Sequence, residues 1–353
     1  MATAASNHRD AQSGADSGGE RSGASSRARI GIAGATGYAG QELVRILARH
    51  PAVTLTTAMA SGSTSTPRAM PALARIWDQP VIPLDVDRLV RETDVVMLAL
   101  PEAASAELAP TLLARDLRVV DLSGAFRLRH DAHRQRWYPA TATLPDGTVY
   151  GLTEGHQKEI RHARLVSNPG CYPTAALLAL EPLRRAGLLT GAIVVDAKSG
   201  VSGAGKAPSE RTHFSENHGS VAAYAVFSHR HTAEIEQELS TAVTFVPHLV
   251  PLDRGILETI YATLTPGTTG QQVADAMTSA YADAPFVRLT GTQLPEIKHV
   301  AHTNFCDIGW SVDEPTERIV LVAVIDNLVK GAAGSAVQNL NVMLGLDERT
   351  GLL

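Results

Sequence analysis

The chain has 353 residues, a formal net charge of −5 and 44% hydrophobic residues, so it can bury the core of one large domain or of two ordinary ones. The negative charge gives no reason to expect a nucleic acid as partner, and no apolar run of about eighteen residues is present that would span a membrane. The two cysteines, Cys171 and Cys306, are too few for a disulfide framework or a cysteine-rich zinc site. We therefore expect a protein of the reducing cytoplasm.

Residues 1–28 differ in composition from the rest. They contain no large apolar side chain after Met1 and cannot bury enough surface to offset the entropy of ordering, so we expect a disordered tail. The tail is rich in serine and arginine, as transit peptides are, but Asp10, Asp16 and Glu20 weigh against that interpretation. It also lacks the apolar segment of a secretory signal.

From Arg29 the sequence predicts a strand at 30–33, a glycine turn and a helix that ends before Pro51. The turn has the spacing G-x-x-G-x-x-G between a strand and a helix, the context in which backbone N–H groups bind the pyrophosphate of a dinucleotide. A purely structural glycine turn is the alternative. The residues expected to contact a cofactor here are Gly34, Thr36, Gly37, Tyr38 and Ala39.

The next predicted strand, VTLTTAMA, is followed by SGSTSTPR. Sites that prefer NAD usually place an acidic residue at the end of this strand, and none occurs between Val53 and Met70. Small hydroxyl groups and a nearby arginine, Arg68, suit a 2′-phosphate instead. We therefore expect NADP(H) as the cofactor, with Ser61 and Ser63 as the leading candidates for contact.

Two further apolar runs, 94–100 and 118–123, read as parallel strands buried on both faces, with a helix between them at 102–116. This alternation predicts a doubly wound α/β sheet. Pro101 and Ser123 follow these strands, at the sheet edge where ligands bind, and ordinary loop chemistry is the alternative. None of the seven tyrosines is followed by lysine four residues later, which excludes a short-chain dehydrogenase.

Cys171 lies in SNPGCYPT, where the turn Asn168-Pro169-Gly170 precedes a predicted helix that begins near Pro173. A thiol at a helix N-terminus faces the positive end of the dipole, which lowers its pKa, and nearby N–H groups can stabilise an oxyanion. We therefore expect Cys171 to be a nucleophile rather than a packed hydrophobic residue, the role that fits Cys306.

A thiolate nucleophile needs a partner that carries its proton, and the leading candidates among thirteen histidines are His229 and His231. Residues two apart on an extended segment face the same way, so both rings are expected in one site, with Glu234 orienting one of them. Thr232 looks like the N-cap of the helix that follows. A surface histidine pair and a metal site are alternatives; we expect no metal, because no further ligand cluster is evident.

Several other positions are candidates for ligand contact. Lys198 ends a predicted strand and precedes a Gly/Ser loop in which Ser202 and Gly203 can approach a cofactor. Arg127 and Arg254 can hold anionic substrate groups, because arginine binds carboxylate and phosphate in a bidentate manner. Asn327 starts the last predicted helix and is a further cofactor candidate, as is Lys330 nearby.

Together these segments resemble the N-acetyl-γ-glutamyl-phosphate reductases of arginine biosynthesis, from Arg29 to Leu353. The stretches that carry the resemblance are GATGYAGQELVRIL, DLSGAFRL, SNPGCYPTAALLAL, VDAKSGVSGAG, HRHTAEI, HLVPLDRGI, NFCDI and IDNLVKGAAGSAVQN. The aspartate-semialdehyde dehydrogenases are broader relatives.

The resemblance implies attack by Cys171 on an acyl phosphate, a thioester, hydride transfer from NADPH, His229 or His231 as acid/base, and substrate contacts from Arg127, Asn168, Lys198 and Arg254. It also implies an NADP-binding domain of residues 29–168 with 326–353, a catalytic and oligomerisation domain of residues 169–325, and a homodimer or homotetramer. The rivals are an aminoadipyl-phosphate reductase of lysine biosynthesis, an aspartate-semialdehyde dehydrogenase and an NADP-binding sensor without catalysis.

Overall fold

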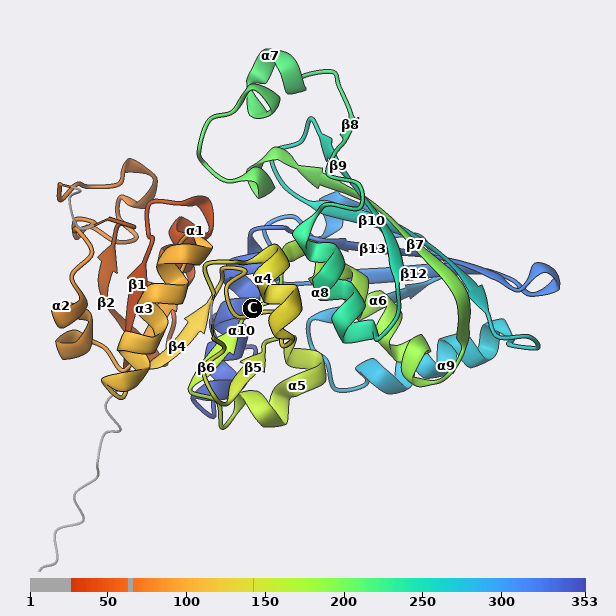
Figure 1. Ribbon diagram of the computed structural model, residues 1–353, viewed down its shortest axis with the longest axis horizontal. Helices are drawn as coiled ribbons and strands as arrows, with labels where there is room; N and C mark the ends of the chain where they lie inside the picture. The colour runs from red at the N-terminus through yellow and green to blue at the C-terminus, as the bar shows by residue number, and fades with distance from the viewer. Residues whose placement is uncertain (1–26, 63–65, 142) are drawn as a thin grey trace, which may run out of the picture.

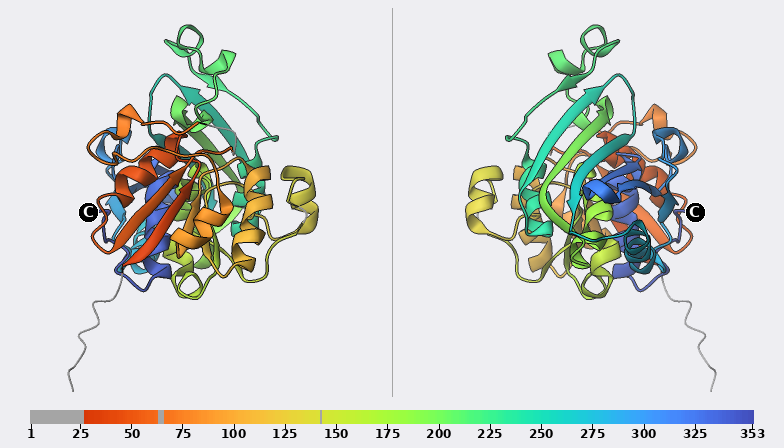
Figure 2. Two further views of the ribbon diagram at one scale, coloured as in Figure 1. Left: turned by 90° about the vertical axis from the view of Figure 1, so that its left-hand side faces the viewer. Right: turned by 90° about the vertical axis from the view of Figure 1, so that its right-hand side faces the viewer.

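Two β-sheets organise the chain (Figure 1). The computed structural model describes residues 27–62, 66–141 and 143–353, so residues 1–26 of the predicted tail lie outside the described residues. No helix within these ranges is long and apolar enough to cross a lipid bilayer. The segment that carries α7 projects beyond both sheets (Figures 1 and 2).

The first sheet has six strands in the order β2-β1-β3-β4-β6-β5, and every pair is parallel. Strands such as β3, in which all four residues are buried, are covered on both faces and read as short apolar runs. The prediction of a doubly wound sheet is confirmed. The strands are β1 (Ala28–Ala33), β2 (Val53–Met59), β3 (Val95–Leu98), β4 (Arg118–Asp121), β5 (Thr148–Tyr150) and β6 (Leu165–Ser167).

Helices cover both faces of this sheet. Leu43 of α1 and Val337 of α10 pack in one cluster, whereas Leu89 of α2 and Leu108 of α3 pack in another. The helices of this half are α1 (Tyr38–Leu47), α2 (Val86–Glu92), α3 (Glu102–Ala114), α4 (Asp131–Trp137), α5 (Thr153–Ile160) and α10 (Gly334–Met343). The C-terminal helix thus returns to the first sheet.

The second sheet is mixed, with seven strands in the order β11-β12-β13-β10-β7-β9-β8. Its strands are β7 (Leu189–Gly200), β8 (Ala222–Ala223), β9 (Val243–Val250), β10 (Ile256–Leu264), β11 (Val287–Gly291), β12 (Cys306–Asp313) and β13 (Arg318–Ile325). Its helices are α6 (Cys171–Arg185), α7 (Phe214–Asn217), α8 (Arg230–Leu239) and α9 (Gly270–Tyr281).

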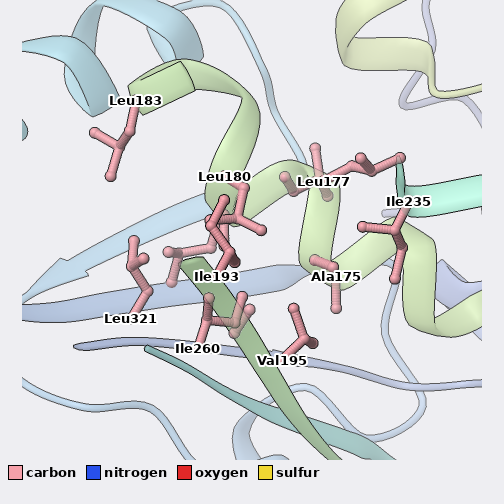
Figure 3. Packing of buried hydrophobic residues seen from close by; sticks show 14 of the residues in the cluster. Ala175, Leu177, Leu180, Leu183, Ile193, Val195, Ile235, Ile260 and Leu321 are labelled. Carbon is pink, nitrogen blue, oxygen red and sulfur yellow. The ribbon is translucent and has the colours of Figure 1, made fainter. Parts of the chain in front are cut away.

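Helix α6 is the centre of the second core. Leu177 and Leu180 pack onto Ile193, Val195 and Ile260 of the sheet (Figure 3). Nearly every residue of the helix from Tyr172 to Leu183 is buried, because the sheet lies on one side and α8 and α9 pack nearby. This burial fixes the position and direction of the helix, and so of the cysteine at its first residue.

The chain crosses back to the first sheet through an irregular turn rather than directly into a helix. A helix is predicted from about Asn327, but a single π-turn at Val329–Ala333 comes before α10. Asp326 explains the turn: its side chain accepts hydrogen bonds from the N–H groups of Leu328 and Val329 at 2.8 and 3.0 Å. Such π-turns commonly occur at functional sites.

Candidate active site

The carboxyl ends of β1, β4 and β6 lie at one edge of the parallel sheet, and the predicted motifs follow these ends. The glycine turn follows β1, Ser123 follows β4 and the turn of Asn168 follows β6. In open α/β sheets this edge holds the ligand. Gly170 is the N-cap of α6, so Cys171 is the first residue of the helix, as the sequence indicates.

A buried carboxylate holds the turn before Cys171 in place. Oε1 of Glu234 accepts hydrogen bonds from the Gly170 N–H and the Tyr150 hydroxyl, both at 2.8 Å. Oε2 forms an ion pair with Arg127 Nη1 at 3.4 Å, and both side chains are nearly fully buried. Glu234 therefore positions the cysteine turn directly and reaches His231 only through Arg127.

The two histidines do meet, but not in the way the sequence suggests. Helix α8 begins at Arg230, so Thr232 lies inside the helix and the N-cap is His229, whose Nδ1 accepts the N–H of His231 at 3.2 Å. The segment is therefore not extended through His231. The ring centroids of the histidines are 4.7 Å apart.

His231 faces the cysteine turn. Its Nε2 lies 3.4 Å from Arg127 Nη1, and it would lie only 2.4 Å from a Cβ atom built on Gly170. Its Nδ1 is buried and has no hydrogen-bond partner among the described residues. An N–H of arginine can only donate, so the bond to Nε2 places the imidazole proton on Nδ1.

The electrostatics of the site keep all three groups uncharged at rest. Burial raises the pKa of the Cys171 thiol to about 11, although Arg127 and the Tyr172 N–H act in the opposite direction. The prediction of a thiol pKa lowered by the helix is therefore wrong, because desolvation outweighs the helix terminus. Burial also lowers the pKa of His229 to about 4 and that of His231 well below its ordinary value.

Two predicted substrate ligands, Arg127 and Asn168, direct their hydrogen bonds to partners inside the protein. Arg127 also donates from Nε to the Asn168 carbonyl and from Nη2 to the Leu122 carbonyl, both at 2.8 Å. Asn168 is 1% exposed; its amide donates to Ser335 Oγ at 3.0 Å and accepts from Asn339 at 2.9 Å. Both side chains fix the cysteine turn, so direct substrate contact is not their evident role.

The other two predicted substrate ligands also have internal partners. Lys198 forms an ion pair with Asp196 at 2.6 Å, on the sheet face opposite Ala197, which packs in the core under α6. Side chains alternate along a strand, so Lys198 points away from Cys171, and its predicted substrate role is not supported. Arg254 pairs with Glu42 and with Asp326, and it links β10 to α1 and to the chain after β13.

The glycine turn has the geometry of a pyrophosphate cradle. Gly34 has φ +94°, and a Cβ there would lie 2.1 Å from the Ala99 carbonyl oxygen, so only glycine fits. Gly37 is the N-cap of α1, and no side chain caps this helix, which leaves its first-turn N–H groups facing the space before Tyr38. Thr36 and Ala39 flank these positions and are half-buried.

The remaining predicted cofactor residues spread along the same edge. Ser61 is exposed just after β2, and Ser63 lies outside the described residues. Pro101 is the N-cap of α3, whereas Ser123 is buried and donates to Asp121 at 2.7 Å. Asn327 is also buried; it accepts the Gly255 N–H and donates to Ser202 Oγ at 2.9 Å, so it braces the loop of Ser202 and Gly203. Lys330 pairs with buried Glu154 and is turned away from this edge.

A cavity of about 340 Å³ lies between the glycine turn and the loop after β7, and Tyr38, Ser202 and Arg254 are among its lining residues. Lys206 also lines it and donates to the Thr36 carbonyl at 3.3 Å. Lys206 was not predicted from the sequence, although a lysine inside the glycine loop after β7 is a signal for such a position. For Tyr150, in a short strand, there was no signal.

Among the described residues, no group of three or more histidine, cysteine, aspartate or glutamate side chains is arranged to hold a metal ion. At this edge the structure brings together a thiol, two imidazoles and one buried ion pair. Such a set can form and break a covalent bond to an acyl carbon.

Comparison with known proteins defines the class. Residues 29–163 match the family model "semialdehyde dehydrogenase, NAD binding domain", and residues 171–327 match "semialdehyde dehydrogenase, dimerisation domain". The fold resembles aspartate semialdehyde dehydrogenase II of Vibrio cholerae, with a TM-score of 0.71 and 19% identity over 91% of this chain and 99% of that one. The enzyme of Candida albicans, solved with NADP, gives a TM-score of 0.68 at 15% identity over 90% of this chain and 99% of that one.

Sequence relatives narrow the class further. The chain is 46% identical to the N-acetyl-gamma-glutamyl-phosphate reductase of Brevibacillus brevis and 44% identical to that of Bacillus subtilis, over 92% of this chain and 97% and 98% of theirs. The chain belongs to the N-acetyl-gamma-glutamyl-phosphate reductase family.

Proposed function

We propose that this protein reduces N-acetyl-L-glutamyl 5-phosphate to N-acetyl-L-glutamate 5-semialdehyde with NADPH, releasing phosphate, in arginine biosynthesis. One observation supports the chemistry most strongly: Cys171 is the first residue of α6, and the imidazole of His231 lies against Gly170, the residue before it, at the cofactor edge of a parallel sheet. The identity to named reductases over nearly the whole chain supports the choice of substrate.

The first step is the attack of the Cys171 sulfur on the acyl carbon. The thiol is protonated at rest, so its proton must leave as the new C–S bond forms. His231 is our candidate for the base, because it is neutral and Nε2 carries the lone pair next to the cysteine turn. The bond to phosphate breaks, phosphate leaves, and a thioester remains on Cys171.

The second step reduces this thioester. The bound dinucleotide supplies a hydride to the carbonyl carbon. N–H groups at the start of α6 can stabilise the oxyanion that forms, because they belong to the positive end of the helix. The C–S bond then breaks, the aldehyde leaves, and His231 returns the proton to the thiolate. His229 carries its proton on Nε2, because Nδ1 accepts a backbone N–H.

The residues along the sheet edge fit a dinucleotide. Gly34 lets the turn pack against the Ala99 carbonyl, the uncapped start of α1 can bind the pyrophosphate, and Lys206 adds a positive charge at the same place. A serine and no acid follow β2, which suits the 2′-phosphate of NADP(H). We include Lys206 among the cofactor-binding residues.

We further propose the domain boundaries expected from the sequence, with residues 29–168 and 326–353 in the cofactor domain and 169–325 in the catalytic domain. The packing of α10 against the first sheet supports this division. The match of residues 171–327 to a dimerisation domain supports a homo-oligomer, for which we propose a dimer or a tetramer in the cytoplasm.

The reverse reaction tests the proposed function. The protein is incubated with N-acetylglutamate semialdehyde, NADP⁺ and phosphate, and formation of NADPH is followed by its absorbance. We expect turnover that requires phosphate and is lost in Cys171→Ser, while that variant still binds NADP⁺. Turnover without phosphate, or full activity of Cys171→Ser, would show that the acyl-phosphate mechanism is wrong. Preference for aspartate or aminoadipate semialdehyde would reassign the substrate.

A further inference from the structure

Glu258 is a carboxyl group buried inside the second core without a partner. It lies in β10 between Ala197 of β7 and Ala323 of β13. Its side chain is fully buried, and neither carboxyl oxygen has a hydrogen-bond partner among the described residues. Figure 3 shows Ile260, two residues further along the strand, packed beneath α6. An unsatisfied buried carboxyl reduces stability, so its presence at this position calls for an explanation.

The strand register places Glu258 close to the nucleophile. A Cβ atom on Gly331 would lie 2.8 Å from the Cβ of Cys171 and 3.2 Å from Cδ1 of Ile325, so the start of α6 lies over Ile325. Ile325 pairs with Ile256 of β10. Glu258 follows Ile256 by two residues on the same face of the sheet, about 7 Å along the strand. The carboxyl group is therefore within about 10 Å of the thiol.

The charges in this region are already balanced without Glu258. Arg127 is paired with Glu234, so a further anion at either Glu258 or Cys171 would be uncompensated. Burial alone raises the pKa of Glu258 well above its ordinary value, and a charge on Glu258 would in turn raise that of Cys171. The other ionisable groups that interact with these two are Tyr172, Tyr224 and Cys306.

We propose that Glu258 is a positioning residue for Cys171: a negative charge on the Glu258 carboxyl group opposes formation of a thiolate in the same part of the core. The proposal rests on the proposed function, because it takes Cys171 as the nucleophile. Burial keeps Glu258 protonated to a pH well above its ordinary pKa, and the protonated carboxyl leaves the thiol unaffected. Once Glu258 ionises, its charge holds the thiol protonated, so a thiolate forms only when a neighbouring imidazole takes the proton and supplies the compensating positive charge.

The test is the pH dependence of Cys171 alkylation by iodoacetamide in the full chain, with the modified cysteine located by peptide mass spectrometry. Glu258→Gln and Glu258→Leu both remove the competing charge. The leucine variant is expected to fold more stably, because it leaves no polar group unpaired in the core. A unit charge at about 10 Å shifts a pKa by about one unit at an effective dielectric constant of about 20. We therefore expect the pH of half-maximal alkylation to fall by about one unit in both variants.

Three comparisons distinguish the loss of the Glu258 charge from a general loosening of the core. At neutral pH both variants should react at the wild-type rate, whereas a loosened core would react faster at every pH. Glu258→Asp retains the charge and should retain the wild-type profile. Glu181→Gln removes another buried carboxyl, ten residues along α6, whose pKa burial raises to about 7, and should change nothing. An unchanged profile in both charge-removing variants would overturn the proposal, and activity lost only with Cys171→Ser would leave the proposed function intact.

Discussion

Replacing Gly170 by alanine tests the geometry between the cysteine turn and its base. Gly170 has φ −65° and ψ 154°, a conformation that alanine adopts without strain, so the substitution acts through contacts alone. The new methyl group would lie 2.4 Å from His231 Nε2 and 2.8 Å from Arg127 Nη1. The first distance is about 1 Å shorter than an ordinary contact, so the imidazole or the turn must move by that amount.

A displacement of about 1 Å between reacting groups can reduce a rate by about a hundredfold, so kcat should fall by about that factor. The assay is the phosphate-dependent reverse reaction, with kcat and the KM for NADP⁺ measured separately. The KM should stay close to the wild-type value, because the glycine turn that we propose as the cofactor site follows a different strand.

Gly270→Ala is the matched control. Gly270 is the first residue of α9, and a Cβ there would meet nothing closer than 3.4 Å, so this variant should keep wild-type kinetics. If Gly170→Ala retains kcat within about twofold, a 1 Å shift at His231 does not matter, and the assignment of this histidine as the base is wrong.

Three further predictions concern stability and cofactor binding. Arg127→Leu leaves its buried carboxylate partner uncompensated and should destabilise the protein by about 3–5 kcal/mol in urea unfolding. Arg318→Leu, which breaks an ion pair with both partners exposed, should have little effect, and equal midpoints of the two variants would contradict the ion-pair role. Burial raises the pKa of Glu258 in the folded state, so its contribution to folding stability is complete below about pH 4 and is lost as the pH rises toward that folded pKa. Glu258→Leu should therefore remove this part of the pH dependence of thermal stability. A wild-type melting midpoint that does not decline relative to that of the variant as the pH rises would refute this. Lys206→Ala should weaken NADP⁺ binding about tenfold in a fluorescence titration, because one charge-assisted contact is lost. Lys158→Ala, at an exposed lysine, is the control. An unchanged Kd in Lys206→Ala would show that Lys206 is not part of the cofactor site.

Local patterns in the sequence predicted most of the fold and the position of the nucleophile. The Asn-Pro-Gly turn and Pro173 mark the start of α6 within two residues, because turn chemistry and helix starts depend on neighbours in the chain. The first parallel strands were equally readable as apolar runs, since strands buried on both faces need no alternation.

Contacts between distant residues could not be predicted in this way. The Arg127–Glu234 pair joins residues 107 positions apart, and its two side chains hold the cysteine turn through hydrogen bonds with Asn168 and Gly170. The lowered thiol pKa expected from a helix start was wrong for the same reason: the burial that overrides the helix comes from the rest of the fold. The N-cap of α8 was misplaced because Thr232 is the common residue type for that role, whereas His229 takes it here.

The face of the strand on which Lys198 lies can be predicted from the sequence. In VVDAKSG the apolar residues Val195 and Ala197 alternate with Asp196 and Lys198, which already places the lysine on the opposite face of the strand. Period-two alternation is therefore a better guide to the direction of this side chain than its position at the end of a strand.

The central claim is that Cys171 carries the acyl group while it is reduced. Its most direct test is to mix the protein with N-acetylglutamyl phosphate without NADPH, quench in acid and map the acyl group by peptide mass spectrometry. The mechanism predicts an N-acetylglutamyl thioester on the peptide containing Cys171, absent in Cys171→Ser and discharged when NADPH is added before the quench. An acyl group found on Cys306, or no acyl-enzyme in a preparation that turns over, would contradict it.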